Sequence, residues 1–151
     1  MKLAEALNLR SDLQKRIAAL RKRVAACSVV QEGEQAAEDP LELIDKCKHT
    51  LDALEQLTCA INRVNSNYRT PQGQTLTELL ARRDNLLQLH SVLNDAAEDT
   101  RRDPDRFGLR EIKWVAILDV ADLHDRCDDL GRQIRDLNNT IQAINWLVEM
   151  E

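Results

Sequence analysis

The chain has 151 residues, of which 31% are charged and 3% aromatic, and it contains four Gly and three Pro. This composition is typical of a helical bundle or coiled coil and excludes an ordinary sheet protein. The net charge of −5 excludes a molecule built as a whole to bind nucleic acid or anionic lipid. A chain of this length is by default one domain, so we predict a single helical-bundle domain over residues 1–151.

The first predicted helix runs from about Lys2 to about Ala26. Its core-facing positions recur at steps of three and four, and one of them is basic. They are Leu3, Ala6, Leu7, Arg10, Leu13, Ile17, Leu20 and Val24. Residues 28–38 then carry a Val-Val pair, an isolated Gly33 and many acids, which predicts an extended connector.

The second predicted helix has a strong start signal. Asp39 can cap it, Pro40 suits the first helical position, and Glu42 follows three residues after the cap. The helix ends within residues 65–67, and residues 71–73 (Pro-Gln-Gly) predict a turn. Its predicted core-facing positions, widened by Leu57 and Val64, are Ile44, Cys47, Leu51, Leu54, Thr58, Ile61 and Asn65.

The third predicted helix opens with a second capping box, Thr75 to Glu78, and ends in a charged loop over residues 99–108. Its core-facing positions are Leu76, Leu79, Leu80, Arg83, Leu86, Leu87, His90, Leu93 and Ala97. In residues 110–118, which follow, the apolar residues Ile112, Trp114 and Ala116 stand at every second position, and β-branched residues are frequent. This pattern predicts a short strand.

The last predicted helix carries the most regular pattern in the chain, and Asp119 can cap it. Nine apolar or thiol side chains recur at alternating steps of three and four, which indicates a long helix packed lengthwise on other helices. They are Val120, Leu123, Cys127, Leu130, Ile134, Leu137, Ile141, Ile144 and Val148.

Four such helices predict an all-α fold, an antiparallel, coiled-coil-like bundle of four long helices, each about 40 Å long. Up-down-up-down order places both long connectors at one end, where residues 29–32 and 112–116 would pair as a small two-stranded β ribbon anchored by Trp114. Residues 1–28 hold seven Lys or Arg against two acids, and residues 114–151 hold eight acids against three Arg. We expect these oppositely charged helices to lie side by side.

Polar residues interrupt the core pattern at one predicted end of the bundle. The same up-down-up-down order brings together two guanidiniums, several amides and a carboxylate, with Glu5 as a further partner. The predicted cluster consists of Arg10, Asn62, Asn65, Arg83, Asp84 and Asn145. Three interpretations stay open: ion pairs that fix helix register, the polar part of a subunit interface, or a pocket for a small anion or metabolite, because arginine donors fork toward carboxylate or phosphate.

Motifs of known chemistry are missing from the chain. Glu does not stand three residues before any of the three His, which argues against a di-iron bundle enzyme, and no Walker loop, GxGxxG or GxSxG occurs. We therefore predict no cofactor, no metal and no catalytic residue. No signal peptide or membrane-length apolar run is visible, and the four Cys form no CxxC pair, so we expect a cytoplasmic protein with reduced thiols.

Several segments along nearly the whole chain resemble the septicolysin-like family of small bacterial proteins. The segments are Met1–Leu7, Val30–Glu34, Glu38–Pro40, Ile61–Asn65, Leu80–Asp84, Glu111–Ala116 and Asn145–Trp146. The family usually carries Thr where this chain has Val64, so any hydroxyl role at that position is lost. The resemblance implies little about function beyond the name, which suggests a pore-forming cytolysin.

The leading functional hypothesis is a cytoplasmic, oligomeric interaction or scaffold protein that contacts a second copy or another protein. The wide apolar stripes of the second and third helices support it, because they can bury surface on a partner beyond the bundle core. The alternative is a small-anion or metabolite binding protein, or an enzyme, that uses the Arg/Asn cluster. The third hypothesis is the cytolysin, against which the missing secretion signal and missing membrane face argue; we expect no contact with membrane or nucleic acid.

Overall fold

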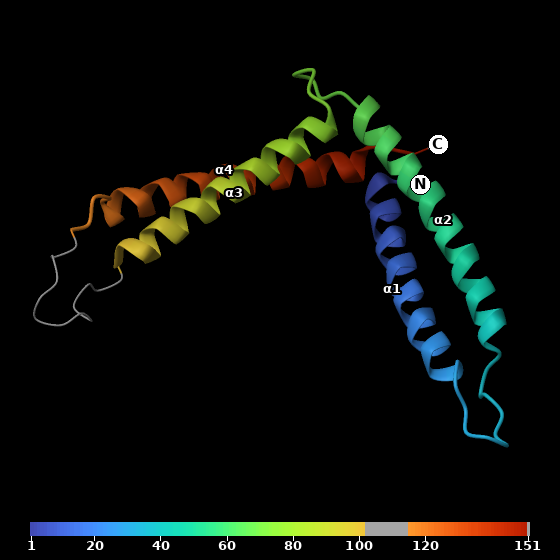
Figure 1. The fold of residues 1–151 in the computed structure, drawn as a ribbon. Coiled ribbons are helices and arrows are strands. Elements are labelled where there is room, and N and C mark those ends of the chain that lie inside the picture. Colours follow the sequence, from blue (N-terminus) through green and yellow to red (C-terminus); the bar gives the residue numbers. More distant parts are fainter. Residues whose placement is uncertain (102–114, 151) are drawn as a thin grey trace, which may run out of the picture. The chain divides into compact units, whose positions relative to one another are not determined.

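The computed structural model describes residues 1–101 and 115–150 and is mainly helical (Figure 1). Four long helices follow one another along the chain: α1 (Leu3–Cys27), α2 (Pro40–Asn67), α3 (Leu76–Arg101) and α4 (Val120–Leu147). The predicted all-α class and the four predicted helices are confirmed.

The chain divides into two compact units. The first consists of Met1–Arg69 with Ala143–Glu151, and the second of Thr70–Gln142. In the first unit α1 and α2 lie side by side in opposite directions, and in the second α3 lies beside α4 (Figure 1). The α4 helix is continuous from one unit into the other, since its last residues belong to the first unit. The prediction of one bundle domain stays a prediction.

The start of each predicted helix after the first is fixed by the expected cap. The Asp39 carboxylate accepts a hydrogen bond from the Leu41 N–H at 2.8 Å, and Asp119 accepts one from the Ala121 N–H at 2.8 Å. Thr75 and Glu78 form the full capping box, because each side chain accepts from the backbone N–H of the other, at 3.1 and 2.7 Å. These bonds satisfy amide groups that the first helical turn leaves without a partner.

The connection between α2 and α3 is a compact turn. The Thr70 carbonyl accepts from the Gly73 N–H at 2.8 Å, and the Thr70 hydroxyl accepts from the Gln74 N–H at 3.1 Å. Gly73 has a φ of 83°, a left-handed conformation that favours glycine. The predicted turn over residues 71–73 is therefore confirmed.

In the first unit α1 buries the predicted face, since none of its expected core-facing positions is exposed. The α2 helix follows its predicted face in part. Its other predicted positions are buried or half-buried, but Ile44 and Leu51 are each 48% exposed, while Leu43 and Thr50, one residue earlier, are buried. The apolar stripe of α2 is broader than one neighbouring helix can cover, so α1 covers one side of it and the other side stays open.

In the second unit the core forms between α3 and α4. Leu86 of α3 packs with Leu130 and Ile134 of α4, and Leu93 and Leu137 contact this cluster. All nine core-facing positions predicted for the last helix are buried or half-buried; eight of them lie in α4 and Val148 directly follows it, which confirms the pattern over the full length of the helix. On α3 the predicted positions are also covered, except Leu87, which is exposed.

The predicted β ribbon is wrong for the residues that the structure describes. Residues 29–32 form no strand: Val29 is 84% exposed, and a turn follows in which the Gln31 carbonyl accepts from the Glu34 N–H at 3.0 Å. Residues 112–114, including Trp114, lie outside the described residues, and Val115 and Ala116 are exposed and belong to no strand. An isolated ribbon is marginal in water, and Val29 has no apolar surface to cover it.

The two ends of the chain pair with each other in the first unit, a contact that the sequence did not indicate. Lys2 and Glu149 form an isolated antiparallel bridge, with the Leu3 N–H donating to the Val148 carbonyl at 3.0 Å. The Met150 N–H donates to the Met1 carbonyl at 2.8 Å. The Lys2 ammonium also lies 2.8 Å from the Glu149 carboxylate. We call these paired residues, 1–3 and 148–150, the terminal clasp.

Candidate functional site

The residues of the predicted polar cluster are divided between the two units. Arg83 and Asp84 belong to the second unit, and the other four belong to the first: Arg10, Asn62, Asn65 and Asn145. Asn145 is buried, with 6% of its surface exposed, whereas Asn62 is exposed. Each unit by itself therefore holds a part of the cluster, and the convergence of all six residues stays a prediction.

Within the second unit Arg83 already has a carboxylate partner. Its Nη2 and Nε atoms lie 2.8 and 3.1 Å from the same Asp84 oxygen. In the first unit Glu5, which was expected near Arg10, accepts from the Lys2 backbone N–H at 2.7 Å and so satisfies the start of α1. The local geometry at Arg83 agrees with the ion-pair interpretation of the cluster.

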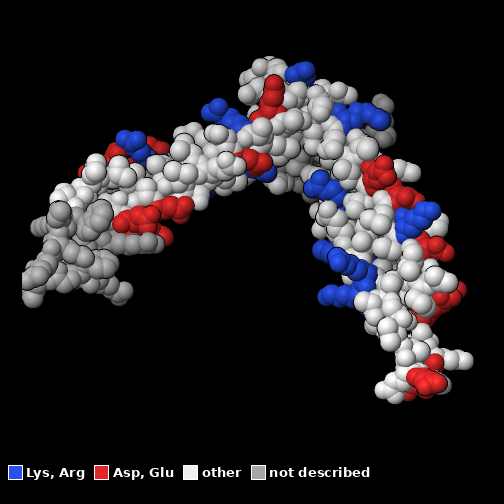
Figure 2. All heavy atoms as spheres, in the orientation of Figure 1, with Lys and Arg blue, Asp and Glu red and all other residues white. Residues whose placement is uncertain are grey.

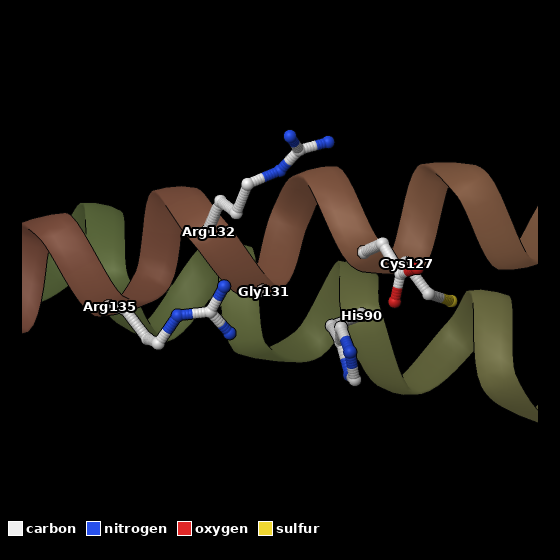
Figure 3. A pocket seen from close by; sticks show the side chains of 6 residues that line it. His90, Cys127, Gly131, Arg132 and Arg135 are labelled. Carbon is white, nitrogen blue, oxygen red and sulfur yellow. The ribbon is translucent and has the colours of Figure 1, made fainter.

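A shallow groove lies between α3 and α4 inside the second unit (Figure 3). It has a volume of about 430 Å³, and it combines a histidine, two arginines and a carboxylate over a glycine. The residues that line it are His90, Cys127, Asp128, Gly131, Arg132 and Arg135. The sequence singled out His90 and Cys127 by their core phase. It gave no signal for the arginines, since charged residues on the open face of a helix are ordinary.

The His90 ring is oriented by a chain of hydrogen bonds that crosses from α4 to α3. The Cys127 thiol donates to the Asn94 side-chain oxygen at 3.3 Å, and the Asn94 amide nitrogen lies 3.2 Å from Nδ1 of His90. An amide nitrogen can only donate, so Nδ1 accepts, and the proton of the neutral ring is on Nε2. His90 therefore offers an N–H donor from the nitrogen that Asn94 does not contact.

Arg135 lies over Gly131 on the α4 side of this groove. A Cβ atom at position 131 would meet one neighbour within 4 Å, the Nη1 atom of Arg135 at 3.5 Å. Figure 3 shows the Arg135 guanidinium folded along α4 toward that glycine. Arg132 is paired with Asp129, whereas Arg135 has no carboxylate partner in the described part of the chain. The groove thus holds one guanidinium that is not neutralised by an ion pair.

Charge is also unevenly placed on the surfaces of the two units. Lys and Arg gather along α1 (Figure 2), where Arg16, Arg21 and Lys22 are exposed and have no carboxylate partner among residues 1–101 and 115–150. At the start of α4, Asp122 pairs with Arg126 at 2.8 Å, but the exposed Asp125 has no such partner among the same residues. The basic row and the acidic start lie in different units, so neither neutralises the other within a unit.

One cross-helix ion pair holds the first unit together near its connector. Arg23 of α1 donates through Nε to Glu38, the residue before the α2 cap, at 2.9 Å, and a second guanidinium nitrogen contacts the same carboxylate. The hydrogen bond from Arg23 lowers the pKa of Glu38. The charge of Arg23 is therefore neutralised within the first unit, and Arg23 is not part of the unpaired basic row.

A second hollow, of about 370 Å³, lies in the first unit between the end of α2 and the terminal clasp. Arg63, Asn67, Tyr68 and Glu149 contribute its polar lining. No group of three or more His, Cys, Asp or Glu in the described part of the chain could hold a metal ion. None of the helices in that same part combines the length and apolarity needed to cross a bilayer.

Comparison with known proteins places the chain in a family. It is 34% identical to a protein of known crystal structure, described as a functionally unknown conserved protein from Corynebacterium diphtheriae, with a TM-score of 0.91 over 100% of this chain and 99% of that one. No curated protein matches. Residues 10–150 match a family of unknown function, DUF6847, so the chain belongs to the DUF6847 family.

Proposed function

We propose that the chain is an oligomeric interaction protein that pairs with a second copy of itself. The observation that carries the proposal is a pair of oppositely charged surfaces. One is the basic row on α1 (Arg16, Arg21, Lys22), and the other is the exposed acidic start of α4, where Asp125 has no ion pair among the described residues and Asp122 pairs only with Arg126 of its own helix. Opposite potentials on two patches of one molecule favour association in a defined register.

Two-fold symmetry would use both patches twice. In a closed dimer, α1 of one copy meets α4 of its partner, and the reverse contact forms at the same time. Each copy then contributes one basic and one acidic surface, and no complementary patch remains open to continue a filament.

Exposed apolar side chains on α2 and α3 support the same proposal. Ile44 and Leu51 lie one helical heptad apart on α2 and are about half exposed, and Leu87 of α3 is exposed to a similar extent. Apolar side chains spaced along one helix face supply the burial that charge pairs at the rim of an interface do not. The four cysteines are all free, which supports a cytoplasmic location, where thiols stay reduced.

The proposal can be tested by exchanging the charges. One variant carries Arg16→Glu with Arg21→Glu, and the other carries Asp122→Lys with Asp125→Lys. Light scattering at low salt should show a dimer for the parent chain and monomers for each variant alone, because each variant opposes like charges at both contacts. An equimolar mixture should form a heterodimer, in which both contacts again join opposite charges.

The matched control is Lys15→Glu with Lys48→Glu, which removes two exposed positive charges outside the unpaired row and should leave the dimer intact. Lys15 already lies 3.4 Å from Asp12, so its charge is compensated locally. A parent chain that scatters as a monomer at micromolar concentration in low salt would contradict the proposal. Two variants that fail to associate when mixed would contradict the assigned surfaces.

A further inference from the structure

We propose that the groove between α3 and α4 is a binding site for a phosphate group, either inorganic phosphate or the phosphate of a small monoester. The site is independent of the self-association proposed above, because all its lining residues belong to the second unit.

The groove presents donors from two helices. On α3, His90 has its Nδ1 atom occupied as an acceptor by the Asn94 amide, so its remaining ring nitrogen presents an N–H group. On α4, Arg135 presents a guanidinium that no described carboxylate neutralises, and guanidinium donors match the oxygens of phosphate. Arg132 lines the same space and is held by Asp129.

The form of the groove favours a tetrahedral anion. A carboxylate presents two oxygens in one plane, whereas a phosphate presents oxygens in several directions and can accept from both helices at once. Gly131 leaves space on the α4 side of the groove, because a side chain at this position would project toward the Arg135 guanidinium. A volume of about 430 Å³ accommodates a phosphate with a small organic group attached.

One residue opposes the anion. Asp128 also lines the groove, and no ion pair in the described residues neutralises its carboxylate. A like charge beside the ligand weakens binding, so two variants should act in opposite directions. Arg135→Gln should raise the dissociation constant for phosphate about tenfold, since one hydrogen bond to a charged group is lost. Asp128→Asn should lower it.

The experiment is an NMR titration of the full chain with inorganic phosphate and, separately, with phenyl phosphate, at fixed pH and with chloride keeping the ionic strength constant. Saturable amide shifts should appear on both helices around His90 and Arg135. The control is Arg126→Gln, which removes an arginine from the same helix without touching the groove lining. It should bind as the parent does, and circular dichroism should show all variants equally helical.

The two phosphate probes distinguish the possible ligands. Tighter binding of phenyl phosphate identifies an ester as the ligand, and equal binding identifies the phosphate group alone; both support the site. Shifts that grow linearly without saturation for both probes would overturn it. So would an Arg126→Gln variant that loses as much affinity as Arg135→Gln, because binding would then follow overall charge and not the groove.

Discussion

Individual side chains decide where the helices of this protein begin. Asp39, Thr75 and Asp119 each accept a hydrogen bond from an amide in the first turn of the helix that follows. These caps were visible in the sequence because their chemistry is local: the donor and acceptor lie within three residues of each other. The link from Cys127 through Asn94 to His90 was not visible, since it joins two helices whose register no local rule fixes.

The capping box of α3 gives the clearest prediction at this scale. Thr75 is 7% exposed, and its hydroxyl both accepts from the Glu78 N–H and donates to the Glu78 carboxylate. Thr75→Ala should lower the free energy of unfolding by about 1–2 kcal/mol, measured by urea denaturation, because a buried cap is lost. Thr77→Ala, two residues later on the exposed side, is the matched control and should change it by less than about 0.5 kcal/mol. Equal effects of the two substitutions would contradict this role of Thr75.

At the scale of whole helices, the spacing of apolar residues predicted three of the four buried faces. It predicted that of α2 only in part: Leu54 and Ile61 are covered as expected, whereas Ile44 and Leu51 remain about half exposed and Leu43 is buried instead. Periodicity shows that a stripe is apolar and how wide it is. It does not show which edge of a wide stripe a single neighbouring helix will cover, because that depends on the partner's own face.

The terminal clasp joins two segments at opposite ends of the chain, and its stability should depend on pH. The hydrogen bond from Lys2, and then the positive charges of Lys2 and the N-terminus, lower the pKa of Glu149 from its ordinary value of 4.5. Because the folded pKa is the lower one, the stabilisation is complete above about 4.5 and is lost as the pH falls through the lowered value.

This loss can be followed by NMR. The amide protons of Leu3 and Met150, which donate across the clasp, should shift in one step as the pH falls from 7 to about 2.5. Glu149→Gln should remove the step, while Glu42→Gln on α2, whose carboxylate lies 3.7 Å from Lys46, should leave it in place. A step that persists in Glu149→Gln would assign the titration to another group.

At the scale of the whole molecule, the sequence could predict the helices and the positions of residues along them, but not whether residues of different helices meet in a polar cluster. The spacing of Arg10 and Arg83 gives their positions along α1 and α3, and both positions are half-buried as expected for core-facing residues. Whether they meet depends on how one unit contacts the other, and no pattern along a single helix contains that information. The α3–α4 groove was missed for a related reason: its arginines become a site only beside His90 of another helix.

The open edge of α2 provides the test of whether the molecule completes its packing with a second copy. Leu51 is about half exposed, so Leu51→Asp should leave the α1–α2 hairpin folded. If a partner covers this edge, the same change places a charge in the interface and should lower the dimer fraction seen by light scattering, since a buried unpaired charge is costly.

The control for that variant lies nearby on the same helix. Leu57 is half-buried, so Leu57→Asp should lower the helicity and the free energy of unfolding, measured by circular dichroism, because it removes a charge from water within the folded unit. The two substitutions separate folding from assembly. A Leu51→Asp chain that unfolds as Leu57→Asp does would show that the edge belongs to the core of a single copy. A Leu51→Asp chain that stays dimeric would exclude this edge from the interface and leave the charged rows to account for assembly alone.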